Sequence, residues 1–133
     1  MCIRDSLITD AEEYGLLGAR AFINESPLVQ ELEFVANFES RGTSGPSLMF
    51  QTSSDSRQLI SWFANSIERP VTSSVFEEVY KRLPRDTDFT IFRDKAGLRG
   101  FNFAFIADGK NNHSPNDSIE TVSYTHLTLP TKD

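Results

Sequence analysis

The sequence predicts an α/β fold, a three-layer sandwich in which helices flank a mixed, mostly parallel sheet. Two observations support this prediction. Short apolar runs at 32–38, 47–52 and 100–106 alternate with segments whose apolar residues recur at helical spacing. The runs are apolar on both faces, so they need helices on both sides of the sheet. The chain of 133 residues suffices for one modest domain with a hydrophobic core.

The N-terminal part of the chain predicts a strand followed by a helix. Leu7-Ile8-Thr9 is expected to end a short buried strand, and the helix is expected over residues 12–24. Ser26-Pro27 interrupts the helical pattern before the strand at 32–38. Residues 43–46 (Thr-Ser-Gly-Pro) have the composition of a turn that leads into the strand at 47–52.

Three more helices are expected between the second and third apolar runs. The first is capped by Asp55 or Ser56 and carries apolar residues on one face up to position 67, and Pro70 ends it. The second covers residues 75–83 and the third begins at 86–88. The last strand then places three phenylalanines on one face, and a polar loop over 108–118 follows it.

The charge of the chain argues against some classes of partner. The formal net charge is −6 and the isoelectric point is about 4.9. Nucleic acids and anionic membranes favour a basic protein surface, so we expect no nucleic-acid partner. No apolar run approaches the roughly 18 residues that a membrane-spanning helix needs.

Two adjacent carboxylates, Glu12 and Glu13, stand where the first strand is expected to turn into the first helix. One explanation is structural: acids in a first turn complement the helix dipole, and Asp10 with Glu13 resembles a capping box. The other explanation is catalytic. Ligands of an open α/β sheet bind at the carboxyl ends of its strands, where one acid can hold a metal while its neighbour takes a proton from metal-bound water.

Two further residues favour the catalytic explanation. Glu39 lies at the end of the second predicted strand, and His113 lies in the loop after the last one. Carboxylate oxygens and imidazole nitrogens that meet at one sheet edge suit zinc. Taken singly, each has an ordinary explanation, because a loop histidine is commonly solvated and a glutamate before Arg-Gly commonly forms a surface ion pair.

In order and context these segments resemble peptidase family M28, a family of zinc exopeptidases. The matching segments are 10–18, 37–39, 86–92 and 113–118, and the stretch 97–105 is most similar to the branch of endoplasmic-reticulum and vacuolar membrane proteases and their bacterial relatives. The resemblance covers nearly all of residues 6–121. It implies a partial phosphorylase/hydrolase-like zinc peptidase domain, a peptide substrate, two zinc ions, and a parent protein that is membrane-anchored or exported.

The resemblance also implies a role for each candidate residue. Glu12 would be the general base of an aminopeptidase and Glu13 a ligand of one zinc. Glu39 and His113 would bind the other zinc, and Asp117 would orient the loop of His113 from outside the ligand set. The resemblance gives Asp88 only a supporting place, outside the metal ligands.

The sequence departs from the family upstream of Glu12. Family members carry a His-x-Asp pair there, which completes both metal sites, and this chain has none. The bases that encode residues 1–5 also encode Ser123-Tyr124-Thr125-His126 on the opposite strand. We therefore expect residues 1–5 and 122–133 to derive from a sequencing adapter, and residues 6–121 to be an inactive part of an active parent.

Two alternatives share the same scaffold. A glutaminyl-cyclase-like acyltransferase uses a single zinc and cyclises an N-terminal glutamine. A binding or scaffold module keeps the fold and loses the metals, since a fold does not fix a function. The presence of Glu12, Glu13, Glu39 and His113 argues against the second alternative for the parent protein.

Overall fold

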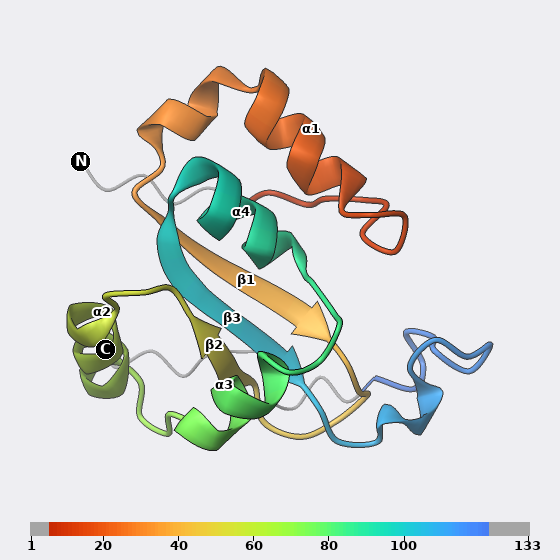
Figure 1. Cartoon of the computed structure of the whole chain (residues 1–133). Coiled ribbons are helices and arrows are strands. Elements are labelled where there is room, and N and C mark those ends of the chain that lie inside the picture. Colours follow the sequence, from red (N-terminus) through yellow and green to blue (C-terminus); the bar gives the residue numbers. More distant parts are fainter. Residues whose placement is uncertain (1–5, 123–133) are drawn as a thin grey trace.

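The computed structural model describes residues 6–122 (Figure 1). Apart from the strand expected at residues 7–9, its regular elements follow the predicted order. They are α1 (Leu17–Glu25), a 3-10 turn (Pro27–Glu31), β1 (Phe34–Ser40), β2 (Leu48–Thr52), α2 (Arg57–Ser66), α3 (Ser74–Tyr80), α4 (Asp88–Ala96), β3 (Arg99–Phe105) and a second 3-10 turn (Gly109–Asn111).

The three described strands form one mixed sheet in the order β1-β3-β2. Strand β3 lies in the centre, parallel to β1 and antiparallel to β2. The pairing of β1 with β3 places Glu39 opposite Ala104, near the carboxyl end of both strands. The predicted α/β class with a mixed sheet is therefore confirmed.

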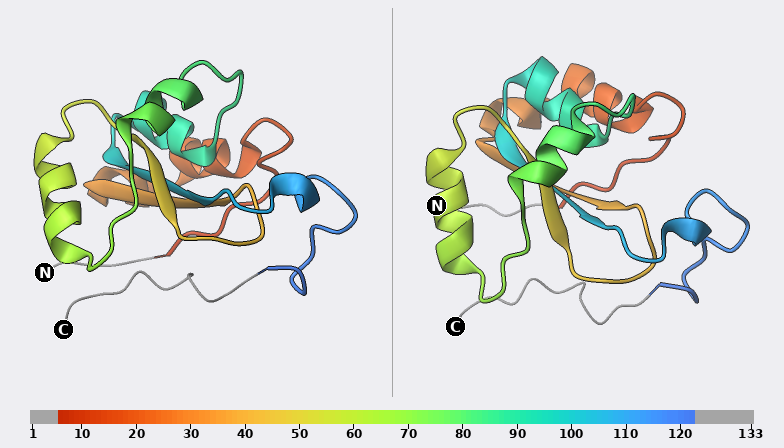
Figure 2. Two further views of the ribbon diagram at one scale, coloured as in Figure 1. Left: turned by 90° about the horizontal axis from the view of Figure 1, so that it is seen from below. Right: turned by 60° about the horizontal axis from the view of Figure 1, so that its bottom comes forward.

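Helices lie on both sides of the sheet, with α3 and α4 over one face and α2 against one end of the other (Figure 2). Successive residues of a strand point to opposite faces, and β3 shows this clearly. Phe101 and Phe103 pack against Phe63 of α2, with ring centroids 5.4 and 5.6 Å apart. On the opposite face, Asn102 contacts the residue before α4 and Ala104 packs against Tyr80 of α3. These contacts confirm the three layers.

Helix α1 lies beyond α4 and extends the core on that side (Figure 1). The rings of Phe22 in α1 and Phe92 in α4 are 6.0 Å apart, and the fully buried Ala19 belongs to the same apolar cluster. Within residues 6–122, none of the helices combines the length and the apolar character that crossing a membrane requires.

One glycine sets the spacing between β1 and β3. A Cβ atom at Gly100 would collide with the carbonyl group of Val35 on β1 and would lie 3.0 Å from the Phe89 ring of α4. Strand, strand and helix therefore meet at a position that only glycine can occupy.

The prediction of a buried strand over Leu7-Ile8-Thr9 is wrong for this structure. These residues have no strand assignment, and the Ile8 side chain is 95 % exposed. A strand needs a hydrogen-bonded neighbour, and residues 7–9 pair with none of the described strands. Thr9 instead donates a side-chain hydrogen bond to Asp88 at the start of α4.

Candidate active site

The segment of Glu12 and Glu13 is a closed loop. Backbone bonds from Leu16 to Glu12 (2.9 Å), from Leu17 to Ala11 (3.2 Å) and from Gly18 to Asp10 (3.1 Å) tie its two sides together. Helix α1 begins only at Leu17, and its first turn contains no acidic residue. The capping explanation for the two acids is therefore wrong, because the helix starts beyond them.

The backbone of this loop adopts an uncommon conformation on both sides of the acids. Ala11 has φ = 59° and Leu16 has φ = 61°, both in the left-handed region, which costs a side-chain-bearing residue about 1–2 kcal/mol. Gly15 (φ = 93°) occupies the same half of the map without that cost. Such strain is typical of functional loops that the surrounding structure holds in place.

Asp88, at the start of α4, anchors this loop through a hydrogen bond. The Thr9 hydroxyl donates to Oδ2 of Asp88, whereas Oδ1 is buried without a hydrogen-bond partner among the described residues. The Asp88 side chain is only 6 % exposed. The supporting place that the resemblance implies for Asp88 agrees with this contact, because the contact joins the first residue of α4 to the residue just before the loop.

Glu39 is positioned by a polar network that runs through the sheet. The side-chain amide of Asn37 donates to Oε1 of Glu39 at 2.8 Å and to Oδ1 of Asn102 at 2.9 Å. Asn102 is fully buried, and its own amide nitrogen donates to Thr87 (2.7 Å) and to Gln51 (3.2 Å). The orientation of the Glu39 carboxylate is therefore fixed from the interior of the protein.

His113 reaches the acids from the other end of the chain. Its Nε2 atom lies 2.7 Å from Oε1 of Glu13, and both side chains are more than half exposed. Asp117 accepts a hydrogen bond from the backbone nitrogen of His113 at 3.3 Å and so contacts the loop rather than the ring. The side chain of His113 thus contacts Glu13, whereas the resemblance pairs it with Glu39.

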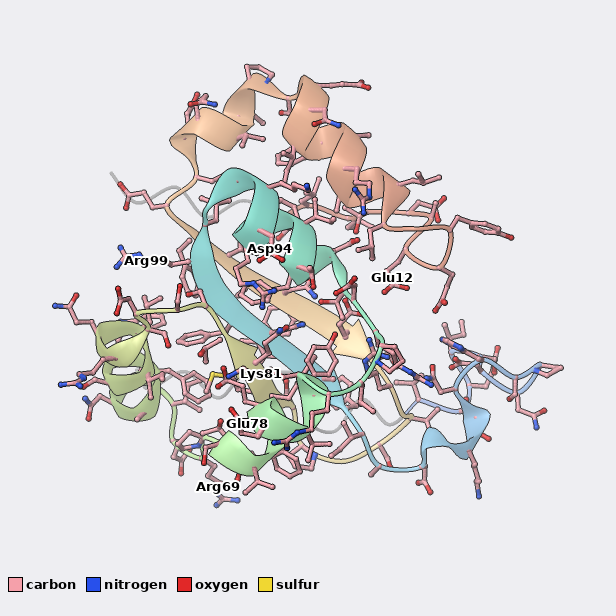
Figure 3. The ribbon with its side chains drawn as sticks, viewed as in Figure 1. Glu12, Arg69, Glu78, Lys81, Asp94 and Arg99 are labelled. Atoms are coloured by element: carbon pink, nitrogen blue, oxygen red, sulfur yellow. The ribbon has the colours of Figure 1, made fainter. Side chains whose placement is uncertain are left out.

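The charges of the cluster influence one another. Burial raises the pKa of Glu12, and the negative charges of Glu39 and Glu13 raise it further, whereas Arg41 lowers it. Burial likewise raises the pKa of Glu39, against the hydrogen bond from Asn37 and the charge of Arg41. These mutual effects show that the three glutamates share one electrostatic environment at the carboxyl end of β1. Figure 3 shows the Glu12 side chain on that side of the molecule.

A cleft of about 350 Å³ opens beside these acids. Its lining combines both signs of charge with the histidine: Glu12, Glu13, Gly15, Leu16, Arg20, Arg41, Arg85, Asp86 and His113. The candidate residues Glu12, Glu13 and His113 therefore share one cleft. Glu39 contributes through its charge, and Asp117 through the loop that carries His113.

The donor types at this cleft suit zinc, which accepts carboxylate oxygens and imidazole nitrogens. Glu13 supplies a carboxylate oxygen and His113 an imidazole nitrogen, and these two atoms lie within hydrogen-bonding distance of each other. The three neighbouring carboxylates favour a cation. Among residues 6–122, however, no group of three or more histidine, cysteine, aspartate and glutamate side chains is arranged to hold a metal ion. The described residues therefore fit zinc in kind and supply only part of a ligand set.

Sequence reasoning overlooked the basic side of the cleft and the buried network. Arg41 stands two residues after Glu39, and this spacing along one strand end was a usable signal. Asn37 likewise precedes Glu39 by two residues, on the same face of β1. The contribution of Asn102 had no local signal, because it depends on the register of β1 with β3.

An α/β sheet with carboxylates and an imidazole at the carboxyl end of its strands is typical of metal-dependent hydrolases. The comparison with protein families specifies this class further. The model of peptidase family M28 matches residues 5–129. The chain belongs to this family of metallopeptidases, as its sequence motifs predict.

Two curated relatives illustrate the branch. Human endoplasmic reticulum metallopeptidase 1 is 31 % identical over 118 residues, which are 87 % of this chain and 13 % of the relative. The vacuolar membrane protease of Lachancea thermotolerans is 31 % identical over 125 residues, 90 % of this chain and 12 % of the relative. The chain thus spans about an eighth of the length of these relatives. No solved structure matches the chain.

Proposed function

We propose that the whole protein is a dizinc aminopeptidase that hydrolyses N-terminal peptide bonds. The gathering of Glu12, Glu13, Glu39 and His113 at the carboxyl end of β1 supports this proposal most directly. Membership of peptidase family M28 and the names of the relatives, a metallopeptidase and a protease, agree with it. The substrate class is accordingly peptides.

In this proposal Glu12 is the general base. Its pKa is raised by burial and by the other glutamates, which suits a carboxylate that must accept a proton and then release it to the departing amine. The closed loop of residues 10–18 fixes the backbone that carries this carboxylate. A bound zinc pair supplies a polarised water and a Lewis acid for the scissile carbonyl.

The remaining candidates hold the metals. Glu13 would bind one zinc, while Glu39 and His113 would bind the other. Asn37 fixes the Glu39 carboxylate through its 2.8 Å bond, and Asp117 fixes the loop of His113 through its bond to the backbone. Such supporting contacts orient ligands and tune their affinity for a metal.

We propose that the 133-residue chain alone has little of this activity. A catalytic zinc has three protein ligands, and residues 6–122 offer no cluster of three. The relatives are named for the endoplasmic reticulum and for the vacuolar membrane. We therefore place the whole protein at a membrane, with the described domain as part of its peptidase unit.

A matched pair of variants tests the role of Glu12. In the whole protein supplied with zinc, Glu12→Gln should lower kcat for release of an N-terminal residue by roughly 10²–10⁴-fold, the range for loss of a general base. Glu78→Gln is the control, because Glu78 is an exposed acid of α3 far from Glu12 (Figure 3). Equal activity of Glu12→Gln and the unmodified protein would disprove the assignment.

A further inference from the structure

Arg41 is the most unusual residue of the cleft outside the acid cluster. Its backbone nitrogen donates to the carbonyl of Phe105 at 3.0 Å, so the main chain is fixed against the end of β3. Its guanidinium carbon lies 5.9 Å from the centroid of the Tyr80 ring. Arg41 is therefore fixed at its backbone, and its guanidinium contacts an aromatic ring.

The side-chain nitrogens of Arg41 have no hydrogen-bond or ion-pair partner among residues 6–122. Its Nε atom is buried and makes no hydrogen bond within residues 6–122. Among the same residues, none of the ion pairs closer than 4 Å involves Arg41, although its charge lowers the pKa of both Glu12 and Glu39. A guanidinium near carboxylates that pairs with none of them remains available to an anionic group of a ligand.

Two other arginines line the same cleft. Arg20 is tied to the rim by a 2.9 Å bond from its Nε to the carbonyl of Gly15, which leaves its two terminal nitrogens free for other contacts. Arg85 also lines the cleft, is exposed, and forms no ion pair with a described residue. Three guanidinium groups thus border a cleft that also contains the proposed base.

We propose that Arg41, assisted by Arg20 and Arg85, forms a carboxylate-binding subsite that selects peptides with a carboxylate next to the scissile bond. This proposal rests on the proposed peptidase function, which makes the ligand a peptide. The carboxylate is either the C-terminus of the peptide or an acidic side chain next to the scissile bond. The planar fork of Arg41 binds such a group through two parallel hydrogen bonds.

The cleft brings Arg41 and Glu12 close together. Both residues line the same space of about 350 Å³, which is near the lower end of the range of about 300–1,000 Å³ for small-molecule pockets. A carboxylate on Arg41 and a scissile bond at Glu12 therefore belong to neighbouring residues of one peptide. The cation–π contact of Arg41 with Tyr80 limits the motion of the guanidinium and so reduces the entropy that binding must remove.

Binding of blocked dipeptides to the full 133-residue chain tests the subsite. The three probes are acetyl-Ala-Ala, its C-terminal amide, and acetyl-Ala-Asp-amide, and their acetyl groups prevent aminopeptidase cleavage. We expect at least one carboxylate-bearing probe to bind about tenfold or more tightly than acetyl-Ala-Ala-amide, as for a hydrogen bond to a charged group. The probe that gains affinity tells the terminal carboxylate from the side-chain one.

The variants identify the residue responsible. Arg41→Gln should remove the difference between the probes, whereas Arg99→Gln should keep it, because Arg99 stands at the opposite end of the sheet (Figure 3). Should Arg41→Gln lose its circular dichroism signal, Arg85→Gln replaces it, since that exposed side chain can change without unfolding the chain. A weaker preference in Arg85→Gln then supports the subsite, and an unchanged preference overturns it.

The outcomes for the subsite and for the function are separable. Equal binding of all three probes, no binding of any, or an unchanged preference in Arg41→Gln would overturn the subsite. Hydrolysis of unblocked Ala-Ala and Ala-Ala-amide by the whole protein is measured separately. A binding preference without hydrolysis refutes the peptidase function and supports the carboxylate site. Hydrolysis without a binding preference supports the peptidase function and refutes the carboxylate site.

Discussion

The side-chain nitrogen Nδ2 of Asn37 donates a hydrogen bond to Oδ1 of Asn102 at 2.9 Å, across the two parallel strands on which these residues lie directly opposite each other. The same nitrogen also donates to Glu39. The buried interior and the candidate active site therefore share one amide group, so a substitution in either should alter the structure of the other.

Removal of the centre of this network should destabilise the fold. Asn102→Ala removes the donor to the buried side chains of Gln51 and Thr87 and the acceptor of one Asn37 amide hydrogen, at a cost of roughly 1–3 kcal/mol for each buried group left unpaired. Urea denaturation measures the loss. Asn65→Ala, at an exposed position of α2, should change the free energy of unfolding by less than about 0.5 kcal/mol. Equal stability of the two variants would contradict the network.

The bond between Thr9 and Asp88 should stabilise the loop of residues 10–18. Thr9→Val keeps the shape of the side chain and removes the donor, so the loss of this charged hydrogen bond should cost about 1.5–3 kcal/mol. Thr72→Val removes a neutral bond to the Met49 carbonyl and should cost about 1 kcal/mol. Denaturation curves of both variants show which one loses more stability. A smaller loss for Thr9→Val than for Thr72→Val would argue against the stabilising role of the bond between Thr9 and Asp88.

Gly18 should be needed for closure of the same loop. A Cβ atom there would lie 2.5 Å from the carbonyl oxygen and 2.8 Å from the nitrogen of Asp10, so Gly18→Ala must push the two sides of the loop apart. The amide resonances of Glu12 and Glu13 should shift in NMR spectra. At Gly97 an added Cβ meets nothing within 4 Å, so Gly97→Ala costs only the strain of its φ of 66°, about 1–2 kcal/mol, and should leave those resonances in place.

Alkaline pH should weaken the contact of α3 with the sheet. Burial raises the pKa of Tyr80 in the folded chain, with the charge of Arg41 acting in the opposite direction. Its neutral form therefore contributes stability that is fully present below the ordinary tyrosine pKa of about 10 and is lost as the pH rises from there through the folded pKa. Unfolding free energies measured between pH 8 and about 11 should fall more steeply for the unmodified chain than for Tyr80→Phe. Parallel curves would refute this dependence.

Calorimetric titration with zinc should show weak binding to the 133-residue chain. The described residues contain no cluster of three ligands, and the contact of Glu13 with His113 offers two. His113→Asn should weaken the remaining binding further, while Asn65→Ala should not. Tight binding of two zinc ions by the isolated chain would show that its ligand set is complete.

The order of the helices and strands and the protein family could be predicted from local patterns in the sequence. Apolar runs and helical spacing identified the strands and helices because those signals lie within single elements. The start of α1 could not be predicted, because the closed loop before it depends on the left-handed backbone conformation of Ala11 and Leu16. Glycine usually marks such a conformation in a sequence, and neither residue is a glycine. The strand expected at 7–9 failed for another reason, since a strand also depends on a neighbour that the sequence pattern cannot supply.

The candidate site was predictable where the residues form motifs. Glu12 and Glu13 stand side by side, and the resemblance added Glu39 and His113. Arg41 and Asn102 were not predictable in the same way. Their importance arises from a cleft and from a strand register, which join segments far apart in the chain.

The parallel pairing of β1 with β3 has a consequence for how the two halves of the site respond to thermal opening. Glu39 lies on β1, which pairs with the central strand β3, and Asn37 links its carboxylate to the buried Asn102, so Glu39 should be displaced only when the sheet itself opens. His113 lies on an exposed loop attached mainly through Glu13 and Asp117, and that loop can open while the sheet stays intact. One half of the site is thus as durable as the core, and the lifetime of any bound metal is set by the other half.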